Sequence, residues 1–233
     1  KQIKNLAEPL KKDKFDISNF ARRAELYELL GEMEKARSDW KRIVEISERT
    51  SLPSRYDLDD IYGACIKLGD NKGFKDRIAS QIKLNKEQIE MTPDSARAHS
   101  KLGICYEHLK KYDRAKREFT TAINLQPGDS LLYWLRACTL IKQGKLDEAL
   151  VDLEKALSYN EDSSQIHEKI AEIRIKKKQP EEALKAVEKA LKIDFASPAA
   201  FYWRGKAFEL LGKEDEAKAN LERGKIYSIS WFK

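Results

Sequence analysis

The chain has 233 residues, of which 41% are hydrophobic and 36% charged, and its formal net charge of +6 arises from 45 basic and 39 acidic side chains. No stretch approaches the roughly 18 apolar residues of a membrane-spanning helix, and no Gly/Ser-rich or Pro-rich tract divides the chain. The composition excludes a membrane span and a low-complexity linker, and it is typical of an elongated helical protein with much surface per residue.

A 34-residue period defines the predicted elements. Alanines stand at equal steps in the sequence at Ala115, Ala149, Ala183 and Ala217. A fixed period of 20–50 residues indicates stacked repeats rather than one globular core. Apolar and small residues within each period are spaced by three or four, which places them on one face of a helix. Each repeat is therefore predicted to be two antiparallel helices joined by a short turn.

The N-terminal part is less regular. We expect a lead-in helix over residues 1–16 and a first repeat over 17–50, where Phe20, Ala24 and Trp40 occupy repeat positions. Residues 51–95 break the period, and we interpret them as a hairpin whose second helix is extended.

Four repeats then follow without a gap, at 96–129, 130–163, 164–197 and 198–231, so that 198–233 holds a repeat and a C-terminal cap. The repeat at 96–129 resembles the tetratricopeptide repeat at the following residues: Leu102, Gly103, Tyr106, Ala115, Phe119, Ala122 and Pro127. Arg136, Arg174 and Arg204 depart from the pattern, because they stand where it prefers apolar or aromatic residues. The resemblance implies an all-α, right-handed solenoid of about six helical hairpins, with the first helices lining a concave binding face.

The motifs of catalysis and metal binding are absent from the sequence. The three histidines (His99, His108 and His167) have no Cys or His partners at zinc spacing, and no phosphate-binding loop or nucleophile motif occurs. The cysteines are interpreted as packing residues, because their odd number does not make a disulfide framework. We expect no enzyme activity, no metal and no cofactor.

The family resemblance predicts which residues line the groove. Residues 131–135 form an apolar run longer than a helix needs for burial. Either the surplus is exposed in the groove and binds a partner, or the curvature of the solenoid buries it against neighbouring first helices. The candidate partner-binding residues are Ile104, Leu131, Trp134, Leu135, Cys138, Ile141, Glu168, Lys169, Glu172, Tyr202 and Trp203.

The expected partner is a protein or peptide with apolar anchor residues. Some relatives grip the C-terminal carboxylates of heat-shock chaperones with Lys, Asn and Arg residues, and only Lys169 could serve in this way here, since Ser100 and Ile104 stand at two of the other positions. Nucleic acid is not expected, although a net charge of +5 on residues 96–233 (26 basic and 21 acidic) keeps an RNA-binding repeat as an alternative. A targeting module of a larger enzyme is a third alternative.

The chain ends carry two further expectations. Tyr227, Ile229, Trp231 and Phe232 make the end apolar, so it continues in a longer protein, packs on the last hairpin or forms a homodimer. Because the chain begins with Lys1 rather than Met, we expect that its N-terminus is trimmed from a longer protein, which leaves open a signal, an anchor or a catalytic domain. We expect a cytoplasmic location.

Overall fold

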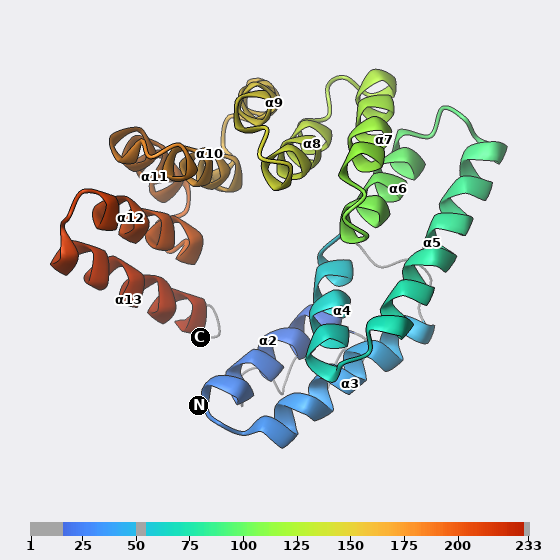
Figure 1. Ribbon diagram of the computed structural model, residues 1–233, viewed down its shortest axis with the longest axis horizontal. Coiled ribbons are helices and arrows are strands. Elements are labelled where there is room, and N and C mark those ends of the chain that lie inside the picture. Colours follow the sequence, from blue (N-terminus) through green and yellow to red (C-terminus); the bar gives the residue numbers. More distant parts are fainter. Residues whose placement is uncertain (1–15, 50–54, 231–233) are drawn as a thin grey trace. The chain divides into compact units, whose positions relative to one another are not determined.

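The computed structural model describes residues 16–49 and 55–230, and every regular element in these ranges is an α-helix (Figure 1). The predicted all-α class is confirmed. The lead-in helix expected at 1–16 lies outside the described residues, apart from Asp16. The helices are α2 (Ile17–Leu29), α3 (Met33–Arg49), α4 (Arg55–Leu68), α5 (Asn71–Met91), α6 (Ala96–His108), α7 (Tyr112–Leu125), α8 (Ser130–Lys142), α9 (Leu146–Tyr159), α10 (Ser164–Lys176), α11 (Pro180–Ile193), α12 (Pro198–Leu210) and α13 (Glu214–Ser230).

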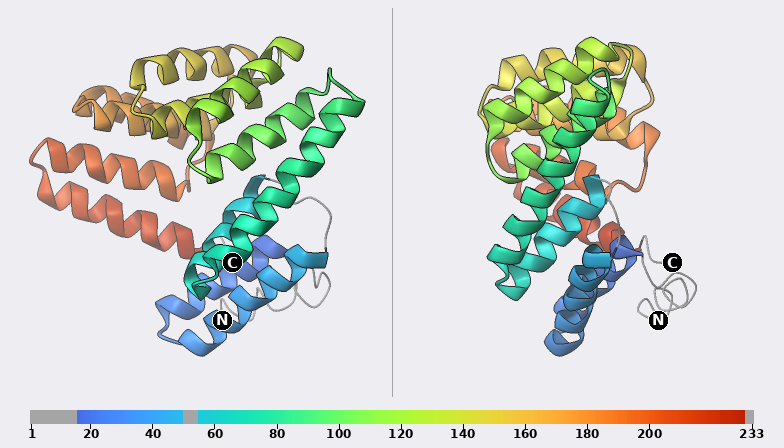
Figure 2. Two further views of the ribbon diagram at one scale, coloured as in Figure 1. Left: turned by 45° about the vertical axis from the view of Figure 1, so that its right-hand side comes forward. Right: turned by 90° about the vertical axis from the view of Figure 1, so that its right-hand side faces the viewer.

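The chain divides into two compact units within α5, after Asn85. The N-terminal unit holds α2, α3, α4 and the first part of α5. The C-terminal unit holds four successive hairpins, formed by α6 and α7, α8 and α9, α10 and α11, and α12 and α13 (Figures 1 and 2).

The first helix of each hairpin begins at a polar cap. A side-chain oxygen accepts a hydrogen bond from a backbone N–H of the first turn, which satisfies one of the donors left free at a helix start. The cap stands immediately before the repeat in all five copies, and these residues are Asp16, Ser95, Asp129, Ser163 and Ser197. From Ser95 onward the caps recur every 34 residues, as the alanines Ala115, Ala149, Ala183 and Ala217 do.

The two helices of each hairpin approach closely at a small residue. A Cβ added to Gly103 would lie 2.7 Å from Cε1 of Phe119. In the next repeat Ala137 stands where Gly103 does, and Leu153 stands where Phe119 does; both are fully buried. A larger side chain on the second helix thus accompanies a smaller one on the first, as close packing requires.

The turn between the helices has a left-handed backbone in all five repeats. Glycine supplies it in three of them, at φ of 71° to 76°. Lys110 and Lys178 take the same position at φ of 57° and 56°. A residue with a Cβ is strained in this conformation, so the two lysines are sites where the backbone overrides side-chain preference.

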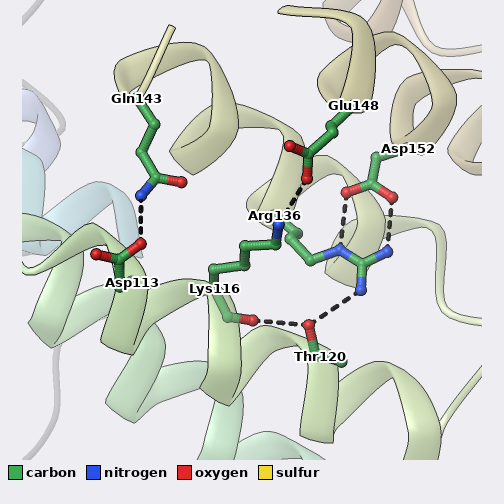
Figure 3. Close-up of polar contacts among 7 residues, drawn as sticks. All are labelled: Asp113, Lys116, Thr120, Arg136, Gln143, Glu148 and Asp152. Carbon is green, nitrogen blue, oxygen red and sulfur yellow. Dashed lines mark hydrogen bonds and ion pairs between the residues drawn. The ribbon is translucent and has the colours of Figure 1, made fainter. Parts of the chain in front are cut away.

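The arginines that depart from the repeat pattern bond polar residues of their own hairpin. Arg136 donates from Nε and Nη2 to Asp152 at 2.8 and 2.7 Å, and from Nη1 to Thr120 of the preceding hairpin at 3.1 Å (Figure 3). Arg204 donates to Asn220 at the same two repeat positions, and Arg174 donates to Gln179 at 2.9 Å. A hydrogen-bonded pair therefore replaces an apolar contact without leaving buried polar groups unsatisfied.

The row of first helices is the more closely packed side of the C-terminal unit. Each first helix contacts the next one (α6 with α8, α8 with α10, and α10 with α12), whereas each second helix packs mainly on the following first helix. Because the first helices approach one another more closely than the second helices do, this stack curves with the first helices on its inner side. We call this side, made by α6, α8, α10 and α12, the first-helix face.

The C-terminal aromatic residues are described only in part. The ring of Tyr227 stacks on that of Phe201, with centroids 5.1 Å apart, so Tyr227 packs on the last hairpin. Trp231 and Phe232 lie outside the described residues.

Candidate functional site

Polar side chains join consecutive first helices. Thr139 of α8 donates from Oγ1 to Oε2 of Glu107 on α6 at 2.6 Å, and Lys142 pairs with Oε1 of the same carboxylate at 2.6 Å. Further along, Ser197, the cap of α12, donates to Glu168 of α10 at 2.6 Å. These contacts place equivalent parts of neighbouring first helices side by side.

The apolar run of α8 divides between the interior and the surface. Leu131 is 53% exposed and Trp134 is half-buried, whereas Leu135 is only 2% exposed. Cys138 and Ile141 are also buried, at 5% and 6%. Leu131 is therefore exposed on α8 and Trp134 is exposed in part, whereas Leu135, Cys138 and Ile141 are buried.

The first-helix face becomes charged at α10. Lys169 and Lys176 pair with the two oxygens of Glu172 at 2.8 and 2.7 Å. Burial opposes the ionisation of Glu172, but the hydrogen bonds from the two lysines outweigh it, so its pKa is lowered. Burial raises the pKa of Glu168, and the hydrogen bond from Ser197 offsets only part of this effect.

Aromatic side chains return at α12. Tyr202 is 44% exposed and meets the half-buried Trp203 edge to face, with ring centroids 4.9 Å apart. Lys206 lies over the Tyr202 ring at 5.7 Å and pairs with Glu209 at 2.8 Å. On α6, by contrast, the predicted groove residue Ile104 is buried at 7% exposure. The exposed apolar residues of the face therefore lie on α8 and α12, with the charged α10 between them.

The histidines and cysteines take part in packing. His99 pairs through Nδ1 with Glu118 at 2.8 Å. His167, at the same repeat position, is buried, and burial lowers its pKa. All three cysteine side chains are buried, and burial raises the pKa of the Cys105 thiol to about 12. A thiol with so high a pKa is a poor nucleophile near neutral pH.

Neither a metal cluster nor a membrane helix is found in the part of the chain that the structure describes. Over residues 16–49 and 55–230, no three His, Cys, Asp or Glu side chains gather as metal ligands would. None of the described helices is long and apolar enough to cross a membrane.

The link made by Glu107 is a feature that the repeat pattern did not predict. Its side chain is buried, and its partner Lys142 lies 35 residues away, one repeat period plus one residue. An acidic residue followed at that spacing by a lysine is a signal that a search for contacts between neighbouring first helices can use.

Comparisons with known proteins agree with this geometry. Three family models, each described as a tetratricopeptide repeat, match residues 96–129, 140–207 and 199–223. A curated relative, a 58 kDa phosphoprotein of Plasmodium berghei, is 33% identical over 88 residues, which are 38% of this chain. The chain spans only 21% of the length of that relative.

Two solved structures share the fold at low identity. MamA (residues 41 to the end) from Desulfovibrio magneticus RS-1 has a TM-score of 0.59 at 16% identity, covering 77% of this chain and 98% of that chain. YrrB, described as a TPR protein with an unusual peptide-binding site, has a TM-score of 0.51 at 17% identity, covering 95% of this chain and 91% of that chain. These two likenesses show the fold alone, whereas the three family matches show that the chain belongs to the tetratricopeptide repeat (TPR) family.

Proposed function

We propose that the chain is a non-catalytic scaffold that holds a segment of a partner protein on the first-helix face of its C-terminal unit. The observation that carries the proposal is the exposure of Leu131 (53%) beside the half-buried Trp134 on that face. An exposed apolar side chain next to a tryptophan, on an inward-curving surface, is typical of the anchor points of protein interfaces.

The rest of the first-helix face supports the same proposal. Tyr202 and Leu210 of α12 are 44% and 46% exposed, which gives a bound segment a second apolar contact beyond α10. YrrB, which shares the fold, is described as having a peptide-binding site. Binding of a peptide by this chain is our proposal and rests on its own exposed residues.

An RNA-binding repeat is less well supported, because most cations of the face already have acidic partners. Lys142 pairs with Glu107, and Lys206 pairs with Glu209. In the basic cluster at 174–178, Lys176 pairs with Glu172 and Lys177 with Asp147. RNA binding depends on several cations that are free to contact phosphates, and these lysines are neutralised.

The test uses a random library of twelve-residue peptides displayed inside a carrier protein. Peptides selected on the wild-type chain are synthesised, and their dissociation constants are measured by fluorescence anisotropy. We expect Leu131→Ala to weaken binding by about tenfold or more. Val151, a 65% exposed residue of the second helix α9, provides the matched control.

The variant and its control separate the face from the general surface. Val151→Ala removes a similarly exposed apolar side chain from a second helix and leaves binding unchanged. Equal affinities for wild type, Leu131→Ala and Val151→Ala would show that the bound segment lies elsewhere.

A further inference from the structure

Within the part of the chain that the structure describes, two cations at the start of the first-helix face have no acidic partner. Arg97 and Lys101 lie four residues apart on α6, and such residues are neighbours on one side of a helix. Among the described residues neither forms an ion pair. Two carboxylates of the same hairpin have other partners, since Glu118 pairs with His99 and Glu107 pairs with Lys142. Burial, and then the charge of Arg97, lower the pKa of Lys101. A carboxylate placed between the two cations would relieve their repulsion.

The repeat register puts these cations of α6 next to Leu131 and Trp134 of α8. The hydrogen bonds from Thr139 and Lys142 to Glu107 hold α6 and α8 side by side. Both are first helices, so they run in the same direction, and equivalent repeat positions are adjacent. Arg97 and Leu131 are both the second residue of their repeats.

The separation of the two helices sets the spacing of a bound segment. Axes of packed helices lie about 8–10 Å apart. An extended chain advances about 3.3 Å per residue, so it crosses from one helix to the next in about three residues.

We propose that the segment bound on the first-helix face carries an aspartate or glutamate about three residues from its apolar anchor, with the acidic side chain on Arg97 and Lys101 and the anchor on Leu131 and Trp134. The inference rests on the proposed function and adds the chemistry of the partner. Opposite charge at the edge of an interface fixes the register of a partner and raises its association rate.

A side-chain carboxylate fits this place better than a chain end or a nucleic acid. Ser100, between the two cations, already donates its hydroxyl to the Arg97 carbonyl at 3.0 Å, and Ile104 is apolar. The site therefore offers two long cationic side chains, while neither Ser100 nor Ile104 provides a donor that would orient a terminal carboxylate. A nucleic-acid backbone brings a charge with every nucleotide, whereas the later lysines of the face are paired.

The experiment uses the same displayed library, whose peptides have no free C-terminus. We expect the peptides selected on the wild-type chain to carry an acidic residue two to four positions from an apolar one. The selected peptides are then synthesised with an amidated C-terminus, and we expect them to bind the Arg97→Gln/Lys101→Gln variant about tenfold or more weakly than they bind the wild-type chain. Replacing the aspartate or glutamate of the peptide by asparagine or glutamine lowers its affinity for the wild-type chain by the same factor. Added salt also weakens binding.

The matched control is Lys185→Gln/Lys192→Gln, which removes two exposed cations from the second helix α11. It leaves the affinity unchanged, and circular dichroism establishes that both double variants are folded.

Each other outcome overturns the inference in a recognisable way. The charge assignment fails if the selected peptides lack acidic residues, or if they bind the Arg97→Gln/Lys101→Gln variant with the affinity of wild type. The proposed function still stands in either case if Leu131→Ala lowers the affinity of the same peptides. If no peptide is selected, both fail. Binding of peptides with a free C-terminus but not of amidated ones would assign the cations to a terminal carboxylate. Binding of poly(U) RNA that only the α6 variant loses would assign them to nucleic acid.

Discussion

The pair formed by Arg136 and Asp152 lends itself to a quantitative test, because the same chain contains its apolar equivalent. Both side chains are largely buried, at 19% and 7% exposure. In the repeat that follows, Ile170 and Ala186 occupy the same two positions and pack in an apolar cluster. The chain therefore shows which apolar residues the hairpin accepts in place of the ion pair.

Asp152→Ala leaves the Arg136 guanidinium buried without its carboxylate. Removal of one partner of a buried pair costs about 3–5 kcal/mol. Since one-fifth of Arg136 is exposed and its bond to Thr120 remains, we expect about 2–3 kcal/mol. The double variant Arg136→Ile/Asp152→Ala removes both charges and is expected to lie within about 1 kcal/mol of wild type.

The assay is hydrogen exchange of the amides of α8 and α9, followed by mass spectrometry. A loss of about 2–3 kcal/mol accelerates exchange about 30- to 150-fold, while α2 and α3 serve as the internal reference. The reasoning is refuted if the double variant exchanges as fast as Asp152→Ala, since the apolar pair would then be no substitute for the ionic one.

Three further predictions concern packing, backbone strain and protonation. Gly103→Ala is expected to cost about 1–3 kcal/mol because its Cβ meets the Phe119 ring; Phe119→Leu in the same chain relieves part of this cost, and additive values in urea denaturation would contradict the packing argument. Lys178→Gly removes the strain of a positive φ and is expected to raise the free energy of unfolding by up to about 1 kcal/mol; a lower urea midpoint would show that no strain is relieved. Burial lowers the pKa of His167 from its ordinary value of 6.5. As the pH falls, this histidine is therefore protonated in the unfolded chain before it is protonated in the folded chain. The stability that the neutral His167 contributes is complete above about pH 6.5 and is lost as the pH falls towards the lowered pKa. His167→Phe should reduce the drop in Tm between about pH 7.5 and 5.5, and an equal drop in both proteins would assign the pH dependence to other groups.

The repeat and the fold class could be predicted from the sequence, because the contacts that define them are local. The spacing of three and four residues within each helix, and the small residues at which the two helices meet, recur in every period. Even the departures are local, since Arg136 finds Asp152 only 16 residues away. Once residues are numbered by their position within the repeat, the sequence shows whether an arginine at a normally apolar position has a polar partner at the facing position of the second helix.

The candidate site was predicted only in outline. The repeat pattern gives Leu131 and Leu135 to the same face of α8, yet one is 53% exposed and the other 2%. Likewise it does not distinguish Lys142, which pairs with Glu107, from Lys101, which forms no ion pair among the described residues. These differences depend on the contacts that α8 makes with α6 and α10.

By itself, then, the amino-acid sequence determined that the chain folds as helical hairpins of the TPR family, since each hairpin is defined by residues within one 34-residue period. Only the tertiary structure decided which residues of the first-helix face meet solvent and which cations keep a free charge. The physical reason is that the burial of Leu135 and the pairing of Lys142 with Glu107 depend on contacts between neighbouring first helices, and these helices lie about one repeat apart in the sequence.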